Sequence, residues 1–278
     1  MFNMAKEICG RPMRSKYNIM LIMIGLFILF GDSAICLQIS PAKIDRSVLA
    51  GENIEQEIIL TNTDPIALDF EIGIFGMGQS LDSGLFEIKA DEEIYPFSAT
   101  EYLKIYPTTI HLEPAQEKRV YLEIAVPPDM PDGSKYALIG IHQVADSSKE
   151  MQTLVYMGIP VILYKNTPNF IKIGQITNLE LSWPNVSITF KNIGNTGFKI
   201  QCEALLKSDK GDTIESINYS SEDIKLKNSI IPLSEIQFEI SLESKDRLEA
   251  GDYIASIFIK LDDGTIIDSK DVLLSIPV

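Results

Sequence analysis

The side chains that most often carry chemistry are sparse in this sequence. It contains only two histidines, His111 and His142, each in a strand-like stretch. Two histidines thirty-one residues apart are fewer ligating and catalytic side chains than a zinc site or a catalytic triad normally needs. The acidic residues at 91–93 and 262–263 lack the alternating oxygen ligands of a calcium loop. We therefore expect both histidines to be structural, and we predict no metal site and no cofactor.

Two further elements resemble nucleophile sites only superficially. Residues 78–84 read GQSLDSG, but they lack the spacing and the strand-to-helix turn of a nucleophile elbow. We expect a loop over residues 76–84. Cys202 lies in the run IQCEALL of residues 200–206 and is expected to be a buried core thiol. We predict that the protein is not an enzyme and binds no small-molecule substrate.

Length and charge restrict the class of partner. The chain has 278 residues, which suggests about two domains, and its 45% hydrophobic and 23% charged residues are typical of a globular protein. Acidic residues outnumber basic ones 39 to 24, giving a net charge of −15. Nucleic acids and anionic membrane surfaces require basic patches, so both are disfavoured. A neutral or basic protein partner fits this charge.

The N-terminal residues have the pattern of an export signal. Four basic residues precede the apolar stretch 19–30, and Ala34-Ile35-Cys36 follows with small residues at the positions that signal peptidase reads. We predict a signal peptide over residues 1–36 and a periplasmic or otherwise extracytoplasmic protein. Two alternatives stay open: a lipoprotein signal with Cys36 as the acylated residue, and a retained N-terminal anchor. Either would attach the protein to a membrane through this segment.

After residue 37 almost every segment has the alternating pattern of a β-strand. The clearest are residues 53–62, 67–75 and 118–126, in which every second side chain is apolar. Further strands are expected at residues 102–106, 109–112 and 136–144. Short strands at regular spacing, separated by turn residues, are typical of a β-sandwich.

A second strand series follows a short break in the pattern. Residues 165–169, KNTPN, are typical of a linker. The strands expected after it lie at residues 170–183, 185–193, 198–207, 224–231, 236–242, 253–261 and 266–276. The two halves show no close sequence repeat. We predict an all-β protein with domains at residues 37–165 and 170–278, each with about seven strands.

An uncharged segment, residues 151–164, closes the first half. Its fourteen residues are too short to span a bilayer, and Gly158 and Pro160 disfavour a helix. It is expected to be a long strand with apolar residues on both faces: Leu154 and Tyr156 face one way and the odd-numbered residues the other. Two hypotheses explain the second apolar face. Either the second domain covers it, or it is open to a partner.

Several short motifs follow one order along the first half. They are PAKI, LTNTD, IYP, LEPAQ and two apolar strands, within residues 39–44, 58–64, 105–107, 111–116, 136–144 and 151–165. In this order they resemble the N-terminal domain of the periplasmic pilus chaperones (the PapD-like family), with Ala115 where that family usually has glycine. Residues 190–196, FKNIGNT, are similar to the second immunoglobulin-like domain of chaperone-like proteins. The resemblance implies two immunoglobulin-like β-sandwiches.

The same resemblance implies a set of partner-binding residues. In that family the last strand of the first domain lends alternate apolar side chains to an unfinished pilin, which is a form of strand addition. Transferred to this sequence, the lending residues are Leu154 and Tyr156. The family also holds the pilin's terminal carboxylate with two basic residues. Lys43 matches the first of them, where arginine is usual, and the non-basic Val161 or Pro160 stands at the second.

A second resemblance is to surface proteins of Gram-positive bacteria that interact with WxL-domain proteins. It rests on the stretch YPFS at residues 95–98, a Leu-x-Pro turn, and a Pro-x-Asp-Gly turn before the strand that reaches residue 140. Those proteins usually end in a membrane helix and a basic tail, for which this sequence shows no counterpart.

We therefore expect an exported, non-enzymatic protein that binds another extracytoplasmic protein by β-strand contacts. The first interpretation is a chaperone-like role in the assembly of a pilus or surface structure, with a pilin-like or surface protein as the client. The alternative is a cell-surface adaptor of the WxL-interacting type that binds surface proteins or the cell wall.

Overall fold

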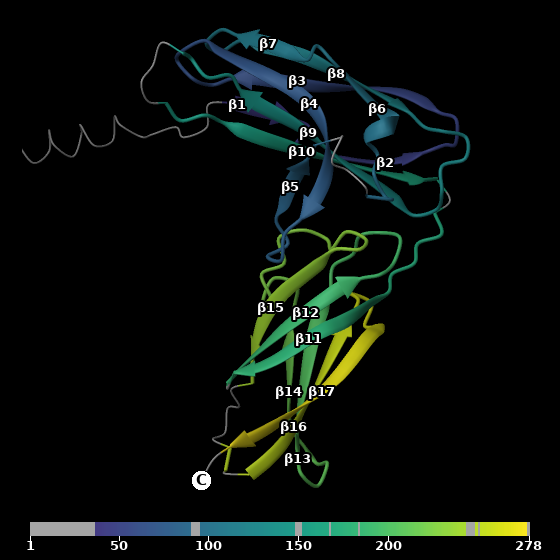
Figure 1. Cartoon of the computed structure of the whole chain (residues 1–278), viewed down its shortest axis with the longest axis vertical. Helices are drawn as coiled ribbons and strands as arrows, with labels where there is room; N and C mark the ends of the chain where they lie inside the picture. The colour runs from purple at the N-terminus through teal and green to yellow at the C-terminus, as the bar shows by residue number, and fades with distance from the viewer. Residues whose placement is uncertain are drawn as a thin grey trace, which may run out of the picture.

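The computed structural model describes residues 37–89, 95–147, 152–166, 168–182, 184–242, 248–249 and 251–276. The predicted signal segment 1–36 and the acidic residues 91–93 lie outside this range. The described chain is all-β apart from one 3-10 turn, Thr100–Tyr102, and its strands form two immunoglobulin-like sandwiches (Figure 1). The predicted fold class is confirmed. No helix of the described residues is long and apolar enough to cross a membrane.

Strands β1 to β10 form the two sheets of the first sandwich. One sheet has the order β1 (Leu37–Ser40), β3 (Asn53–Asn62), β8 (Glu117–Ala125) and β6 (Leu103–Tyr106). The other has the order β2 (Ile44–Val48), β10 (Tyr156–Lys165), β9 (Ser134–Gln143), β4 (Leu68–Gln79) and β5 (Leu85–Ile88), and β7 (Thr109–Leu112) also pairs with β4.

The core of the first sandwich contains the side chains that alternate along the predicted strands. Ile58 and Leu60 of β3 meet Val120, Leu122 and Ile124 of β8, and all five are buried. Burying one such side chain stabilises the folded state by roughly 1.5–3 kcal/mol relative to leaving it exposed. The alternation predicted from the sequence is therefore confirmed in these strands.

Strands β11 to β17 form the second sandwich. Its sheets have the orders β11 (Gly174–Ser182), β12 (Asn185–Asn192), β15 (Glu235–Ser241) and β14 (Thr213–Tyr219), β13 (Gln201–Ser208), β16 (Gly251–Lys260), β17 (Ile266–Ile276). Phe190, Ile200 and Ile257 are fully buried between them.

The strand predicted at residues 224–231 is wrong. This segment consists of turns and one isolated bridge, and Lys225 has a φ of 56° that no strand accommodates. Its apolar side chains Ile224, Leu226 and Ile230 are buried in the core of the second sandwich, which explains the apolar pattern. In the second sandwich the prediction missed β14, whose Ile214 is exposed, so its sequence carries no one-sided apolar signal.

The loop predicted at residues 76–84 is also wrong over part of its length. Strand β4 continues to Gln79, and β5 pairs with its last four residues to form a hairpin. The glycine that favoured a loop has a packing role. A Cβ on Gly78 would lie 2.4 Å from the ring of Phe86, so only glycine leaves room for that ring. The turn is confined to residues 80–84.

Cys202 is fully buried on β13, with 1% of its surface exposed. Burial raises the pKa of its thiol to about 12, because the apolar surroundings disfavour the thiolate. We expect no measurable labelling of Cys202 by a thiol reagent at pH 8 in the native protein, and rapid labelling in denaturing urea. Peptide mapping after labelling measures this, and fast native labelling of Cys202 would contradict the buried position.

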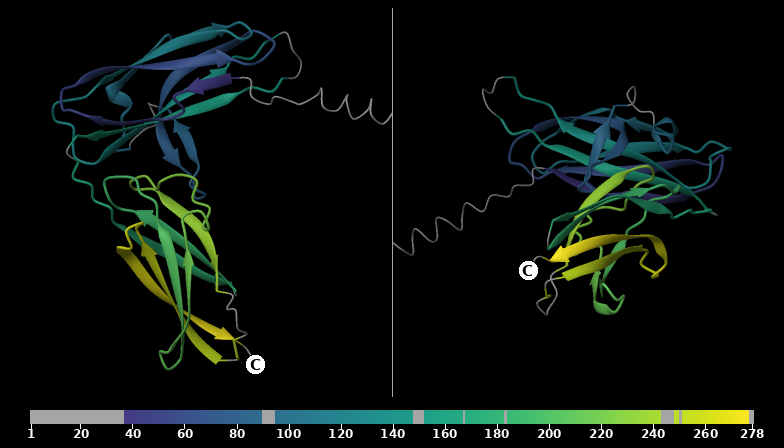
Figure 2. Two further views of the ribbon diagram at one scale, coloured as in Figure 1. Left: turned by 180° about the vertical axis from the view of Figure 1, so that it is seen from behind. Right: turned by 60° about the horizontal axis from the view of Figure 1, so that its bottom comes forward.

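The first sandwich lies across one end of the second, and the β4–β5 hairpin reaches toward the second sandwich (Figures 1 and 2). The buried phenol of Tyr136 accepts a hydrogen bond from the Gly197 N–H at 2.6 Å. The Ser134 N–H donates to the Asn195 carbonyl at 2.9 Å. Met77, Tyr136 and Ile231 belong to one buried cluster. The two sandwiches therefore share a small core of their own.

Candidate functional site

Strand β10 is only half covered along one of its edges. It pairs with β9 from Tyr156 to Tyr164, whereas the parallel pairing with β2 on its other side spans only Val161 to Lys165. Within the described chain, no strand pairs with Tyr156–Pro160 on that side. We call this half of β10 the free edge.

The strand begins later than the sequence predicted. Residues 152–155 precede β10, and the Val155 N–H donates to the side chain of Gln143 rather than to the β9 backbone. The predicted long strand over residues 151–164 is therefore wrong at its start. Leu154 is half-buried and lies outside the strand.

The backbone groups of the free edge have a defined direction. The Val155 carbonyl accepts a hydrogen bond from the Gln143 N–H at 2.9 Å, so odd-numbered residues of β10 pair with β9. Antiparallel pairing alternates along a strand, and the N–H and C=O groups of Tyr156 and Gly158 therefore point away from β9. Pro160 comes next, as is usual for proline at a sheet edge.

The side chains of β10 separate into the two faces that the sequence predicted. Ile159, Val161 and Leu163 are buried in the core of the first sandwich. On the opposite face, Ile162 packs against the cluster shared with the second sandwich, whereas Tyr156 is 64% exposed. The second sandwich therefore covers one end of this face and leaves the other open.

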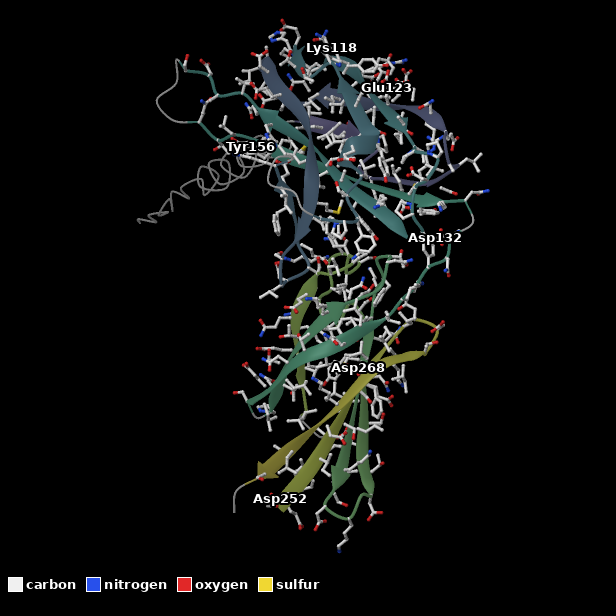
Figure 3. All side chains as sticks on the ribbon, turned by 45° about the vertical axis from the view of Figure 1, so that its right-hand side comes forward. Lys118, Glu123, Asp132, Tyr156, Asp252 and Asp268 are labelled. Atoms are coloured by element: carbon white, nitrogen blue, oxygen red, sulfur yellow. The ribbon has the colours of Figure 1, made fainter. Side chains whose placement is uncertain are left out.

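A groove of about 450 Å³ lies over the face of the sheet, between β5 and the residues of β10 that form the free edge. We call it the β10 groove; its lining residues are Leu85, Phe86 and Glu87 of β5, Leu138 and His142 of β9, and Tyr156, Met157, Gly158 and Pro160 of β10. Phe86 is 49% exposed. Figure 3 shows Tyr156 on the side of the first sandwich opposite Asp132, which lies near the connection to the second sandwich. Open backbone groups and exposed aromatic rings thus lie together.

His142 connects the two walls of the β10 groove. Its Nε2 lies 2.8 Å and 2.9 Å from the carboxylate oxygens of Glu87 on β5. Its ring meets that of Tyr156 edge to face, with centroids 5.0 Å apart. The described residues contain no cluster of metal-ligating side chains, at this histidine or elsewhere. The contacts of His142 are those of a positioning residue between β5, β9 and β10.

The structure does not bring the three predicted binding residues together. Tyr156 lines the β10 groove, Leu154 lies just before β10, and Lys43 lines a separate cavity of about 350 Å³ between the two sandwiches. Pro160 contributes to both cavities.

The cavity between the sandwiches has a nearly neutral polar rim. The ammonium of Lys43 lies 2.7 Å from a carboxylate oxygen of Asp45, and both residues line the cavity. Val161 is fully buried and points into the core of the first sandwich. The position that faces the cavity is therefore Pro160, which carries no charge. Lys43 has no basic neighbour from β10 at this place.

Sequence reasoning missed the β5 wall of the groove. The short alternation Leu85-Phe86-Glu87-Ile88 was the available signal, and it was obscured by the glycine-rich residues before it.

His111 lies away from the groove, on β7, between two carboxylates. Its Nδ1 is 2.8 Å from Asp69 and its Nε2 is 3.2 Å from Glu113. The hydrogen bond to Asp69, followed by that to Glu113, raises the pKa of His111 above its ordinary value of 6.5. A raised folded-state pKa gives a stabilising contribution that is fully present below the unfolded pKa and is lost as the pH rises through the folded pKa.

We expect an NMR titration to place the His111 pKa above 6.5, and Asp69→Asn to lower it toward that value, because the stronger of the two carboxylate contacts is removed. A His111 pKa that is unchanged in the Asp69→Asn variant would contradict this assignment.

No family model and no curated protein sequence matches the chain. Among solved structures, a chain of the chaperone–tip adhesin complex of CFA/I fimbriae aligns at 13% identity and a TM-score of 0.46, covering 87% of this chain and 99% of that one. The chain is similar to fimbrial chaperones.

Two further chaperone structures give comparable alignments. The class 5 fimbriae chaperone CfaA aligns at 13% identity and a TM-score of 0.40, over 87% of this chain and 100% of its own. The E. coli chaperone DraB aligns at 12% identity and a TM-score of 0.38, over 86% of this chain and 98% of its own.

Proposed function

We propose that the protein is an exported, non-enzymatic, chaperone-like protein that binds another extracytoplasmic protein by strand addition at the free edge of β10. The observation that supports this most is the coincidence of open backbone groups at Tyr156 and Gly158 with the apolar β10 groove. Main-chain hydrogen bonds give such a site affinity, and a pocket for alternate side chains gives it specificity.

The geometry limits the length of the added strand. On its open side, β10 offers the N–H and C=O groups of Tyr156 and Gly158 before the pairing with β2 begins at Val161. A partner strand therefore extends the line of β2 and ends close to Lys43, which precedes β2. We propose that Tyr156 carries the main side-chain contact and that Leu154 flanks it.

Lys43 is proposed as a contact at the end of the partner strand. Its pairing with Asp45 leaves a small net charge there, so it suits a polar or terminal group less strongly than two basic residues would. The net charge of −15 favours a neutral or basic client. A pilin-like subunit or a surface protein of the same envelope meets these requirements, and neither nucleic acid nor a small-molecule substrate is involved.

Photocrosslinking in the source cells tests the proposal. A benzophenone amino acid at position 156 of the full chain is expected to crosslink one extracytoplasmic protein. The same amino acid at position 123 serves as the matched control, because Glu123 is exposed on β8 in the opposite sheet. Figure 3 labels both positions.

A crosslink from position 156 and not from position 123, lost when Gly158 is replaced by proline, supports strand addition. Equal yields from both positions, or none from position 156, would refute it. A robust hydrolase activity of the purified protein would refute the non-enzymatic assignment.

A further inference from the structure

The β4–β5 hairpin extends beyond the first sandwich. Strand β4 pairs with β9 as far as Phe75, and its remaining residues, Gly76 to Gln79, pair with β5. A two-stranded ribbon of this length is marginally stable in water by itself. Its stability therefore depends on what it contacts outside the first sandwich.

The tip of the hairpin is bound by the second sandwich. Ser83 is 2% exposed, and its hydroxyl accepts a hydrogen bond from the Lys227 N–H at 2.9 Å. The side-chain amide of Asn228 donates to the Ser83 carbonyl at 3.0 Å. The Gln237 N–H of β15 donates to the Leu81 carbonyl at 2.7 Å. The turn is thus held through its backbone and not only through its side chains.

Gln79 makes a second attachment at the end of β4. Its Nε2 donates to the Ser229 carbonyl at 2.9 Å, and its Oε1 accepts from the Ile231 N–H at 3.0 Å. One side chain thereby satisfies both backbone groups of a turn segment in the second sandwich. Asp82 also pairs with Lys227, but both side chains are exposed and such a pair contributes little.

The same hairpin forms one wall of the β10 groove. Leu85, Phe86 and Glu87 of β5 line the groove, and Phe86 packs over Gly78 of β4. Glu87 contacts His142 across the groove floor. The same ribbon therefore has its tip in the second sandwich and its side at the proposed binding site.

We infer that the second sandwich positions β5 as the wall of the β10 groove, which makes Gln79, Ser83 and Asn228 positioning residues for partner binding. This inference rests on the proposed function. It assigns a role in binding to residues that do not line the groove, and it gives the second sandwich a part in recognition.

Hydrogen–deuterium exchange on the full chain measures the positioning without a partner. Gln79→Ala is expected to speed exchange of the β5 amides about tenfold, because two hydrogen bonds that oppose local opening are lost. Exchange of the β9 amides is expected to stay unchanged. Asn228→Ala removes a contact from the other side and is expected to act in the same direction. Gln175→Ala, an exposed glutamine on β11, is the matched control and is expected to change neither.

Crosslinking from position 156 then tests the consequence for binding. Both variants are expected to lower the yield about tenfold, with Gln175→Ala at the wild-type level. Unchanged β5 exchange in both variants would overturn the inference. Faster exchange with an undiminished crosslink would also overturn it, while leaving the proposed function in place. Absence of a crosslink in the otherwise unaltered protein would refute the proposed function, and with it the role in binding, whatever the exchange data show.

Discussion

Replacing Asn192 with alanine is expected to lower the free energy of unfolding by about 3 kcal/mol or more. Asn192 is fully buried at the end of β12. Its Nδ2 donates to the Thr196 and Ile230 carbonyls at 2.8 Å and 2.7 Å, and its Oδ1 accepts from the Gly194 N–H at 2.8 Å. Alanine leaves three buried backbone groups without this partner, and each such group costs roughly 1–3 kcal/mol.

Asn62 has the corresponding place in the first sandwich, at the end of β3. Its Nδ2 donates to the Ile66 and Leu112 carbonyls at 2.8 Å and 3.0 Å, and its Oδ1 accepts from the Asp64 N–H at 2.9 Å. Asn62→Ala is therefore expected to destabilise the protein by a similar amount.

Urea unfolding followed by far-ultraviolet circular dichroism measures both variants. Asn53→Ala is the matched control, because Asn53 is exposed at the start of β3. This substitution is expected to change the free energy of unfolding by less than about 0.5 kcal/mol. A loss below about 1 kcal/mol for Asn62→Ala and Asn192→Ala would mean that water or a rearranged turn replaces the amide.

These two asparagines show a repeat that the sequence did not reveal. In each sandwich the backbone carbonyl of the asparagine also accepts a hydrogen bond from a backbone N–H. The donor is a residue with positive φ that follows a proline: Ala115, with a φ of 57°, and Leu233, with a φ of 64°. The asparagine and its distant carbonyl partner are 50 residues apart in the first sandwich and 38 in the second. Because these separations differ in length, the turn that the two sandwiches share is not visible as a sequence repeat. The left-handed conformation also explains why glycine suits the position of Ala115.

Strands with one face in the core were predicted correctly, whereas β5 and β14, which lack such one-sided burial, were missed. Strands β3 and β8 have one face in the core, so every second residue is apolar and the period is visible. Strand β5 belongs to a ribbon outside the first sandwich, and β14 is an edge strand with an exposed isoleucine. Neither is subject to the one-sided burial that produces the pattern. Residues 224–231 are turns with buried apolar side chains, and their sequence therefore has the apolar pattern of a strand.

The candidate site was predictable on one side only. Side chains alternate between the two faces of any strand, so the sequence predicts which residues of β10 share a face and that Tyr156 points outward. The opposite wall depends on a contact between Glu87 and His142, which are 55 residues apart, and on a hairpin held by the second sandwich. No local pattern encodes such contacts, because they arise from packing between separate elements.

Replacing Gly158 with proline is expected to lower partner binding at least about tenfold while leaving the fold intact. The Gly158 N–H points away from β9, so its removal breaks no hydrogen bond of the β9–β10 ladder. A Cβ at this position meets only a methyl group of Leu138, at 3.6 Å, which is ordinary contact. The substitution therefore removes one of the two edge donors and places a ring where the partner strand would lie.

A proline one residue later distinguishes the loss of an N–H at the free edge from the loss of an N–H that pairs with β9. Ile159→Pro removes an N–H that faces β9 and disturbs a buried side chain, so it is expected to cost about 3 kcal/mol or more of stability. Crosslinking from position 156 and urea unfolding, measured on both variants, distinguish the two effects. If Gly158→Pro keeps the wild-type crosslink, the partner does not pair with this edge; if it unfolds the protein as Ile159→Pro does, the edge is not open. Loss of the crosslink with the unfolding midpoint retained is the outcome that strand addition requires, because the missing N–H and the proline ring both act on a strand paired with the backbone of β10.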